Sequence, residues 1–222
     1  AVMEDTGCRT LAEFRALPIE KLFASWQKLK ATNRKYAMVC APCMDGVFLT
    51  ENGIDTVAAG GQRNIPYLIG TTSHDVMPPF LFQMAKSWCR TQDAQKKKPS
   101  YAWFFDRKLP GDDNGAWHSS DLWYWFGTLS NGWRPFTDKD RALSEQMTDY
   151  LTNFVRTGNP NTGVSAFADG DSSKAAKALP EWKPISANQK KVLRLGEGET
   201  RMGSVSMPKL VYTMLTNKAV GE

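Results

Sequence analysis

The sequence lacks several features that would point to a particular class of protein. It contains only two histidines in 222 residues, His74 and His118. No run approaches the roughly 18 apolar residues that a membrane-spanning helix needs, and no long low-complexity tract is present. The first residues carry no basic segment followed by an apolar one, so we expect no signal peptide. With 41% hydrophobic and 23% charged residues, the composition is typical of a globular protein.

Concentrated positive charge is also scarce. The net charge is +5, and the densest basic run, Lys96 to Lys98, is followed by Pro99 and carries no interleaved aromatic residues. Such a run favours a solvated loop over a surface that binds phosphates. We therefore expect neither a nucleic acid nor a membrane as a partner.

The four cysteines offer no clear metal or redox centre. Cys40 and Cys43 have the CxxC spacing of either kind of site. A redox pair should open a helix, but residues 44–46 are a turn signal, and a structural zinc ion would need two further ligands at similar spacing. Cys8 and Cys89 lie far away in the sequence. We expect no metal and no cofactor, and free thiols of this kind fit a reducing compartment.

Apolar periodicity predicts an α/β protein. Two near-continuous apolar runs, Ile65 to Gly70 and Ser100 to Phe105, are typical of strands buried on both faces, and a helical pattern from Phe80 to Cys89 lies between them. The result is a strand–helix–strand unit. The other expected elements are two short amphipathic helices within residues 10–30 separated at Pro18, a helix over Arg141–Arg156 capped by Gly158, a strand over Lys191–Leu195 and a last helix over Pro208–Leu215.

Polar residues follow both predicted strands. The first strand continues into Thr71 to Asp75, and the second into a loop from Arg107 to Gly115 and then His118. The carboxyl ends of parallel strands meet at one edge of a sheet, where loops hold side chains for chemistry. An acid after one strand and a histidine after the next is the arrangement of an α/β-hydrolase, whose chain order is nucleophile, acid, histidine.

Six segments, in order along the chain, match motifs of one enzyme family. They are Gly7-Cys8 with Leu11 to Leu17, the turn Pro42 to Gly46, the strand end Gly70 to Asp75, the loop Gly115 to Leu122, the late helix end Asn153 to Asn161 and the turn Leu179 to Trp182. Together they resemble the type-B carboxylesterases, which include cholinesterases and bacterial para-nitrobenzyl esterases. The resemblance implies an α/β-hydrolase fold with a mostly parallel sheet flanked by helices, of which residues 1–222 would be the C-terminal part of a single domain.

The resemblance also assigns residues to a catalytic triad. His118 would be the general base and Asp75, where the family usually has Glu, the acid that orients it. The substrate would be a small-molecule carboxylic ester. A competing interpretation makes His118 a helix-start residue bonded to Asp121, and Asp112, Asp113 and Asp121 are the other candidate acids, each more typical of a loop or turn. His74 matches no family position, and we interpret it as structural.

Three departures from the family pattern matter. No G-x-S-x-G occurs in the 222 residues, and the closest stretch, Gly163 to Phe167, lacks the closing glycine. The resemblance therefore implies that the nucleophilic Ser and the oxyanion loop lie in an N-terminal portion of the same enzyme. Phe14 stands where secreted members have the second cysteine of a disulfide begun at the Cys8 position, which favours a cytoplasmic over a secreted enzyme. Only 43 positions separate Asp75 from His118, which implies a short lid and a shallow site.

The aromatic residues after His118 admit two interpretations. Trp117, Trp123, Trp125 and Phe126 have a spacing that is typical of a helix packed in a core, but pocket walls are also apolar and aromatic. We name Trp123, Phe126 and Met77 as candidate substrate-binding residues. The alternative for the whole chain is a non-catalytic esterase-like interaction module. The presence of both triad candidates argues against that alternative.

Overall fold

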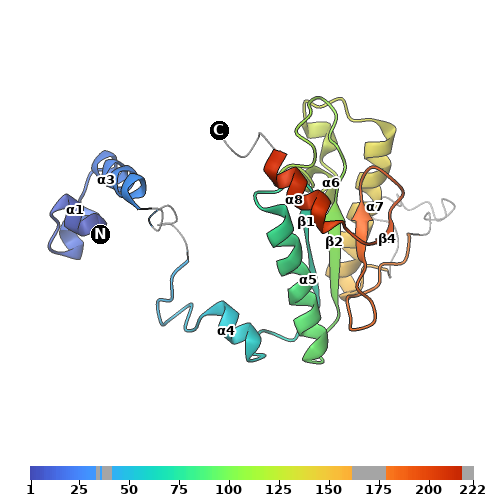
Figure 1. Ribbon diagram of the computed structural model, residues 1–222, viewed down its shortest axis with the longest axis horizontal. Coiled ribbons are helices and arrows are strands. Elements are labelled where there is room, and N and C mark those ends of the chain that lie inside the picture. The colour runs from blue at the N-terminus through green and yellow to red at the C-terminus, as the bar shows by residue number, and fades with distance from the viewer. Residues whose placement is uncertain (34–35, 37–41, 162–178, 217–222) are drawn as a thin grey trace. The chain divides into compact units, whose positions relative to one another are not determined.

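The computed structural model describes residues 1–33, 36, 42–161 and 179–216 of the chain (Figure 1). The chain divides into two compact units, Ala1–Asp55 and Thr56–Glu222, and each is described by itself. The expectation that residues 1–222 form part of one domain stays a prediction. The stretch Gly163 to Phe167 lies outside the described residues, as does Cys40.

The described residues of the first unit form three helices, α1 (Val2–Thr6), α2 (Leu11–Arg15) and α3 (Ile19–Thr32). A further helix, α4 (Gly53–Ala58), spans the boundary between the two units in the sequence. The prediction of two helices within residues 10–30 is confirmed, and Pro18 is the N-cap of α3. Ser25 of α3 is buried and donates to Asp5 at 2.7 Å. It is the one buried residue in α1 to α3, so these three helices bury few side chains.

The second unit is built on a four-stranded sheet in the order β1 (Tyr67–Thr72), β2 (Ser100–Phe105), β3 (Val192–Leu195), β4 (Arg201–Gly203). The first three strands are parallel, and β4 is antiparallel to β3. The strand β4 was not expected, because three residues are too few to carry an alternating pattern. The sheet is therefore mostly parallel, as predicted.

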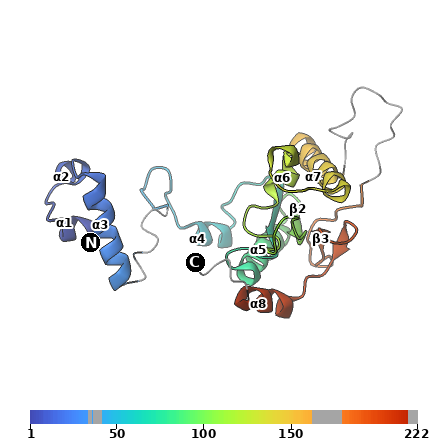
Figure 2. The same cartoon turned by 90° about the horizontal axis from the view of Figure 1, so that it is seen from above.

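Helices cover both faces of this sheet (Figure 2). The helices α5 (Pro78–Ala94) and α8 (Met207–Thr216) lie on one face, and α6 (Leu122–Trp125) and α7 (Asp138–Thr157) lie on the other. Because successive strand residues point to opposite faces, Ala102 and Phe104 join the core under α5 and α8, whereas Tyr101 and Phe105 join the core under α6 and α7. Two buried cores thus hold β2 at the centre of the unit.

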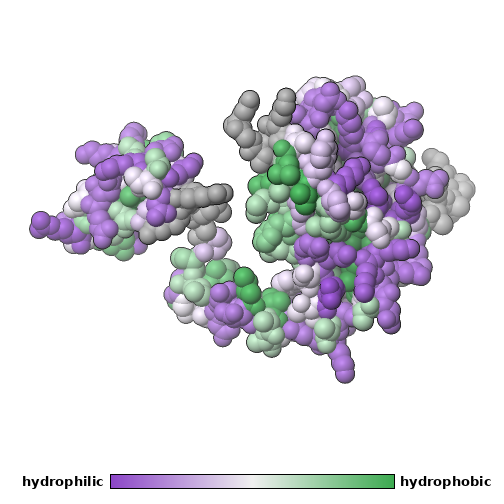
Figure 3. All heavy atoms as spheres, viewed as in Figure 1, coloured by the Kyte–Doolittle hydropathy of each residue, from purple (hydrophilic) through white to green (hydrophobic). Residues whose placement is uncertain are grey.

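Apolar side chains also remain exposed on the face formed by α5 and α8 (Figure 3). Phe80 and Met84 of α5, and Leu215 of α8, are each more than half exposed. The two helices therefore present apolar surface beyond the part that they bury against the sheet.

The boundaries of β1 differ from the prediction in a way that affects the site. The strand was expected at residues 65–70 and lies at 67–72, because Thr71 and Thr72 pair with Phe104 and Phe105 of β2. A β-branched residue suits a strand, whereas Pro66 has no N–H to donate. Gly70 pairs with Trp103 inside the strand, and a glycine is needed there because a Cβ would come within 2.2 Å of the Trp103 ring. Asp75 is therefore three residues beyond the strand, not five.

Membrane and metal features are absent from the described part of the chain. No helix there is both long and apolar enough to cross a membrane. No three His, Cys, Asp or Glu side chains within the described ranges are grouped as a metal site would require. Cys89 is fully buried, and burial raises the pKa of its thiol to about 12, so it is protonated at neutral pH.

Candidate active site

Asp75 and His118 lie together at the carboxyl end of the parallel strands. Asp75 follows β1, and His118 lies in the irregular segment between β2 and α6. The two segments run side by side, because the His74 N–H donates to the Ala116 carbonyl at 2.9 Å. The Nδ1 atom of His118 then lies 2.7 Å from Oδ1 of Asp75.

The Asp75 carboxylate is buried and is held by donors from its own neighbourhood. Its Oδ2 accepts hydrogen bonds from the hydroxyls of Thr71 at 2.9 Å and Thr72 at 3.2 Å. Its Oδ1 accepts one from the Val76 N–H at 2.9 Å. Burial by itself raises the pKa of Asp75, but the bonds from Val76, His118 and Thr71 outweigh it and hold the pKa below its usual value. The carboxylate is therefore charged at neutral pH.

The His118 ring is engaged on one side only. Its side chain is 67% exposed, and within the described residues the second ring nitrogen, Nε2, has no hydrogen-bond partner. A neutral imidazole whose Nδ1–H donates to a carboxylate leaves Nε2 as an acceptor. In this arrangement Nε2 can take a proton from a group on the open side of the ring.

His74 supports the loop that carries His118. Its ring packs on Gly115 so closely that a Cβ there would lie 2.5 Å from the imidazole, and Gly115 has a φ of +68° that favours glycine. Ser73 Oγ is 2.9 Å from His74 Nδ1. Burial, with a smaller contribution from the charge of Lys209, lowers the pKa of His74, so the ring is neutral at neutral pH. The structural interpretation of His74 agrees with this packing.

The other candidate acids are engaged elsewhere. Asp121 is buried and accepts from Trp125 Nε1 at 2.9 Å, and burial raises its pKa. Asp112 pairs with Arg134, and the exposed Asp113 pairs with Lys108 at 2.6 Å. The hydrogen bond of His118 thus goes to Asp75 and not to Asp121, contrary to the helix-start interpretation.

The three candidate substrate-binding residues differ in their surroundings. Met77 is 47% exposed and Phe126 64% exposed. Trp123 is half-buried against the core under α6 and α7, with its ring 5.7 Å from that of Trp117. Trp123 therefore follows the core interpretation, whereas Met77 and Phe126 are free to contact a ligand.

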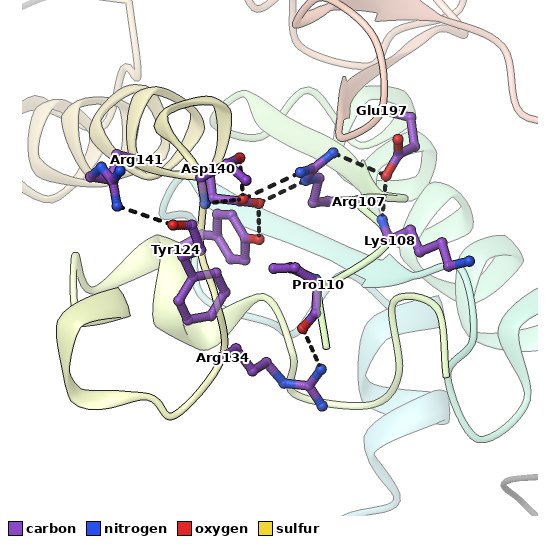
Figure 4. A network of polar contacts seen from close by, with 10 residues as sticks. Arg107, Lys108, Pro110, Tyr124, Arg134, Asp140, Arg141 and Glu197 are labelled. Atoms are coloured by element: carbon purple, nitrogen blue, oxygen red, sulfur yellow. Dashed lines mark hydrogen bonds and ion pairs between the residues drawn. The ribbon is translucent and has the colours of Figure 1, made fainter. Parts of the chain in front are cut away.

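A buried polar network fixes the beginning of the loop after β2 (Figure 4). Arg107, two residues beyond β2, donates to both carboxylate oxygens of Asp140 in α7, at 2.7 and 3.2 Å. The Tyr124 hydroxyl of α6 donates to Asp140 at 2.7 Å, and Glu197 accepts from the Lys108 N–H at 2.6 Å. Burial raises the pKa of Asp140, but the bonds from Arg107 and its other donors outweigh it and keep the pKa far below its usual value. This network ties the start of the loop after β2 to α6, to α7 and to the residue two positions beyond β3.

Sequence reasoning missed two groups of residues that shape this site. The Thr71 and Thr72 hydroxyls were assigned to the loop and not to the support of Asp75, although two threonines three and four positions before an acid are a usable signal. The hydrogen bonds of Arg107 and Arg134 join residues 22 to 90 positions apart in the sequence, so no local pattern indicates them.

The fold and the paired acid and histidine define an α/β-hydrolase, and comparison with known proteins supports this class. The solved structure of a PNB esterase superposes with a TM-score of 0.71 at 18% identity, covering 96% of this chain and 52% of that chain. An esterase from anaerobic Clostridium hathewayi, described as able to hydrolyse aliphatic aromatic polyesters, superposes with a TM-score of 0.67 at 16% identity. The superposition covers 99% of this chain and 51% of that chain. These similarities establish the fold.

Residues 77–211 match the model of the carboxylesterase family, and the chain belongs to that family. It is 48% identical over 109 residues to mouse (Mus musculus) bile salt-activated lipase, and this match covers 47% of this chain and 18% of that protein. It is 39% identical over 71 residues to bovine (Bos taurus) carboxylesterase 4A, and this match covers 29% of this chain and 12% of that protein. The chain thus spans less than a fifth of the length of these relatives, and about half of the solved esterases.

Proposed function

We propose that this chain is the acid- and base-bearing portion of a carboxylic ester hydrolase that uses a Ser-His-Asp triad. The observation that carries the proposal is the 2.7 Å contact between His118 Nδ1 and the buried Asp75, with the rest of the imidazole open to solvent. Family membership supports ester hydrolysis as the reaction.

In the proposed mechanism His118 moves one proton in each half-reaction. Its Nε2 takes the proton of the serine hydroxyl as the serine oxygen attacks the ester carbonyl, and then gives that proton to the departing alcohol as the acyl-enzyme forms. A water molecule repeats the cycle: His118 takes its proton, the hydroxyl attacks the acyl group, and the proton returns to the serine as the carboxylic acid leaves. Asp75 stays ionised throughout and stabilises the imidazolium.

The serine and the oxyanion hole would come from an N-terminal portion of the same enzyme. Two facts support this: the 222 residues contain no G-x-S-x-G, and the chain covers 52% of a solved esterase of the same fold. Among the described residues β1 pairs only with β2, so its outer edge is open to a further strand. We propose that the N-terminal portion continues the sheet there. The position of Phe14, with Cys8 a free thiol, supports a cytoplasmic enzyme.

The substrate would be a small-molecule ester with room for bulky acyl groups. The 43 positions from Asp75 to His118 are used by α5, β2 and their connections, which leaves no space for an inserted helical lid. Exposed Met77 and Phe126 flank the acid and the histidine in the sequence and would contact the apolar part of the ester.

The test is turnover of p-nitrophenyl esters by the full-length protein that contains this chain. We expect steady hydrolysis by the full-length protein, none by residues 1–222 alone, and restored hydrolysis when the N-terminal portion is co-expressed. His118→Ala should abolish activity, whereas Lys97→Ala should not; Lys97 binds loop carbonyls at Gly60 and Gln62, away from the proposed site. Steady turnover by residues 1–222 alone would refute the proposal that the serine lies elsewhere. A folded full-length protein without turnover would favour an interaction module.

A further inference from the structure

The position of His118 depends on a long segment without regular structure. Twelve residues, 106–117, separate the end of β2 at Phe105 from His118. The Arg107 network holds the start of this segment, and His74 holds its end at Gly115. The middle, residues 110–114, is held by a residue that lies beyond the site in the sequence, Arg134.

Arg134 reaches this middle part from the connection between the 3-10 helix η2 (Leu129–Asn131) and α7. Its Nη1 donates to the Pro110 carbonyl at 2.9 Å (Figure 4), and its Nη2 pairs with Asp112. Asp112 in turn accepts from the Asn114 N–H at 3.0 Å, which closes the turn just before Gly115. The hydrogen bond from Arg134 is the main cause that lowers the pKa of Asp112, so that partner is ionised at neutral pH.

The guanidinium of Arg134 is enclosed by aromatic rings. Its Cζ lies 4.8 Å from the ring centre of Trp133, 5.9 Å from Trp117 and 6.0 Å from Trp123. The side chain is 5% exposed, and its Nε has no partner among the described residues. A planar cation between aromatic faces is held in one orientation. One of these rings belongs to Trp117, the residue directly before His118.

We propose that Arg134 is a positioning residue for His118. It fixes the turn from Pro110 to Asn114 and packs against Trp117, so the segment that His74 docks arrives with His118 Nδ1 directed at Asp75. Without Arg134 the segment keeps its two ends but loses its middle, and His118 samples orientations in which Nδ1 does not reach Asp75. This inference rests on the proposed function only for its effect on turnover; the orientation of His118 is independent of it.

The orientation can be measured without any activity. Residues 1–222 contribute only two histidines, His74 and His118, to the imidazole signals of a full-length protein labelled with ¹⁵N-histidine. The signals that disappear in His118→Ala belong to His118. We expect wild-type His118 to carry its proton on Nδ1 at about pH 8, the tautomer that donates to a carboxylate. Arg134→Ala should give a mixture with the Nε2–H tautomer, and Arg134→Lys a smaller admixture, because a lysine keeps the charge but loses the planar fork.

The matched control is Arg141→Ala. Arg141 also donates to an aspartate, Asp138, and to a backbone carbonyl, that of Phe136, but it is exposed, and among the described residues it makes no hydrogen bond or ion pair with residues 106–118. It should leave the His118 signals unchanged. Asp112→Asn removes the ion pair while keeping the stacked guanidinium, and should change the signals in the same direction as Arg134→Ala.

In turnover of p-nitrophenyl esters, Arg134→Ala should lower kcat at least tenfold with KM changed less than twofold, because the base and not the substrate is displaced. A folded Arg134→Ala or Asp112→Asn protein with an unchanged His118 tautomer would overturn the inference. Loss of folding in Arg134→Ala, Arg134→Lys and Asp112→Asn alike would also overturn it. A wild-type protein without turnover, whose His118 signals still change in Arg134→Ala, would refute the proposed function and leave this inference standing.

Discussion

The two segments that meet in the site are held in different ways. Asp75 lies three residues beyond a paired strand, and its carboxylate receives hydrogen bonds from Thr71, Thr72 and Val76, all within four positions of it. His118 lies at the end of a long loop held by side chains from α7, from residue 134 and from residue 74. The acid is thus placed by local structure and the base by tertiary contacts. Variants near Asp75 should change its charge and bonding locally, whereas variants far from His118 should still displace it.

The largest effect is expected when the charge of the acid, Asp75, is removed. In the full-length enzyme, Asp75→Asn should lower kcat by up to about 10⁴-fold, because an amide favours the wrong imidazole tautomer. His118→Ala should lose at least as much, and the two losses should not add, because the residues act as one unit. The measurement is kcat at saturating ester, with circular dichroism to check folding.

The control for Asp75→Asn is Asp121→Asn, because Asp121 is also a buried acid and lies three residues after His118. It should cost far less kcat, since an asparagine still accepts from Trp125. Full activity in Asp75→Asn together with collapse in Asp121→Asn would transfer the acid's function to Asp121.

The loop's dependence on distant contacts can be broken at Asp140. Asp140→Asn leaves Arg107 with only the exposed carboxylate of Glu197, and breaking a buried pair costs about 3–5 kcal/mol of the free energy of unfolding. Asp138→Asn, two residues earlier and 96% exposed, should change it by no more than about 0.5 kcal/mol. Urea unfolding of the two variants makes the comparison. Equal effects would show that the buried network does not stabilise this side of the protein.

A fall in pH should change the stability contributed by Asp75 and Asp140 in the opposite direction from that contributed by Asp121. The pKa values of Asp75 and Asp140 are lowered in the folded protein, so the stability that these groups contribute is present above their unfolded pKa of about 3.9 and is lost as pH falls through the folded values. The pKa of Asp121 is raised, so its contribution is present below about 3.9 and is lost as pH rises through the folded value.

Urea midpoints between about pH 3 and pH 8 measure this difference. The stability of Asp121→Asn relative to wild type should increase with pH, whereas that of Asp75→Asn should decrease. Parallel pH profiles for both variants and the wild type would contradict the opposite signs.

A smaller effect is expected from the donors to Asp75. Thr71→Val keeps the shape of the buried side chain but removes the hydroxyl that donates at 2.9 Å. The loss of one such bond is worth about 1 kcal/mol, which corresponds to about fivefold in kcat if it is felt in the transition state. Thr148→Val, whose hydroxyl bonds a carbonyl of α6 instead, serves as the control in the same assay. A kcat equal in both variants would mean that Thr71 does not hold the acid.

The smallest effect concerns the backbone beside His118. Ser119 has a φ of +69°, in the left-handed region that only glycine adopts without strain. Ser119→Gly should relieve that strain and raise the free energy of unfolding by about 0.5–1 kcal/mol, with kcat nearly unchanged. Thermal unfolding reports the gain. A destabilised variant would show that the Ser119 side chain makes a stabilising contact.

Much of the fold could be predicted from the sequence because its signals are local. The apolar run Ser100–Phe105 gave the bounds of β2 as observed, and α7 differs from the prediction by three residues at its start and one at its end. The strand β1 was displaced by two residues, since pairing with Phe104 and Phe105 draws Thr71 and Thr72 into the sheet. The short antiparallel β4 has too few residues to leave a pattern.

The sequence by itself determined the α/β order of elements and placed an acid and a histidine after neighbouring parallel strands, because strand periodicity and chain order are written along the chain. Only the tertiary structure decided which carboxylate His118 contacts. The sequence offers both Asp75 and Asp121 as acids, but in the folded chain Asp121 accepts from Trp125, whereas Asp75 faces His118. It also decided what holds the loop. The buried cations Arg107 and Arg134 find their carboxylates only when distant segments pack and exclude water.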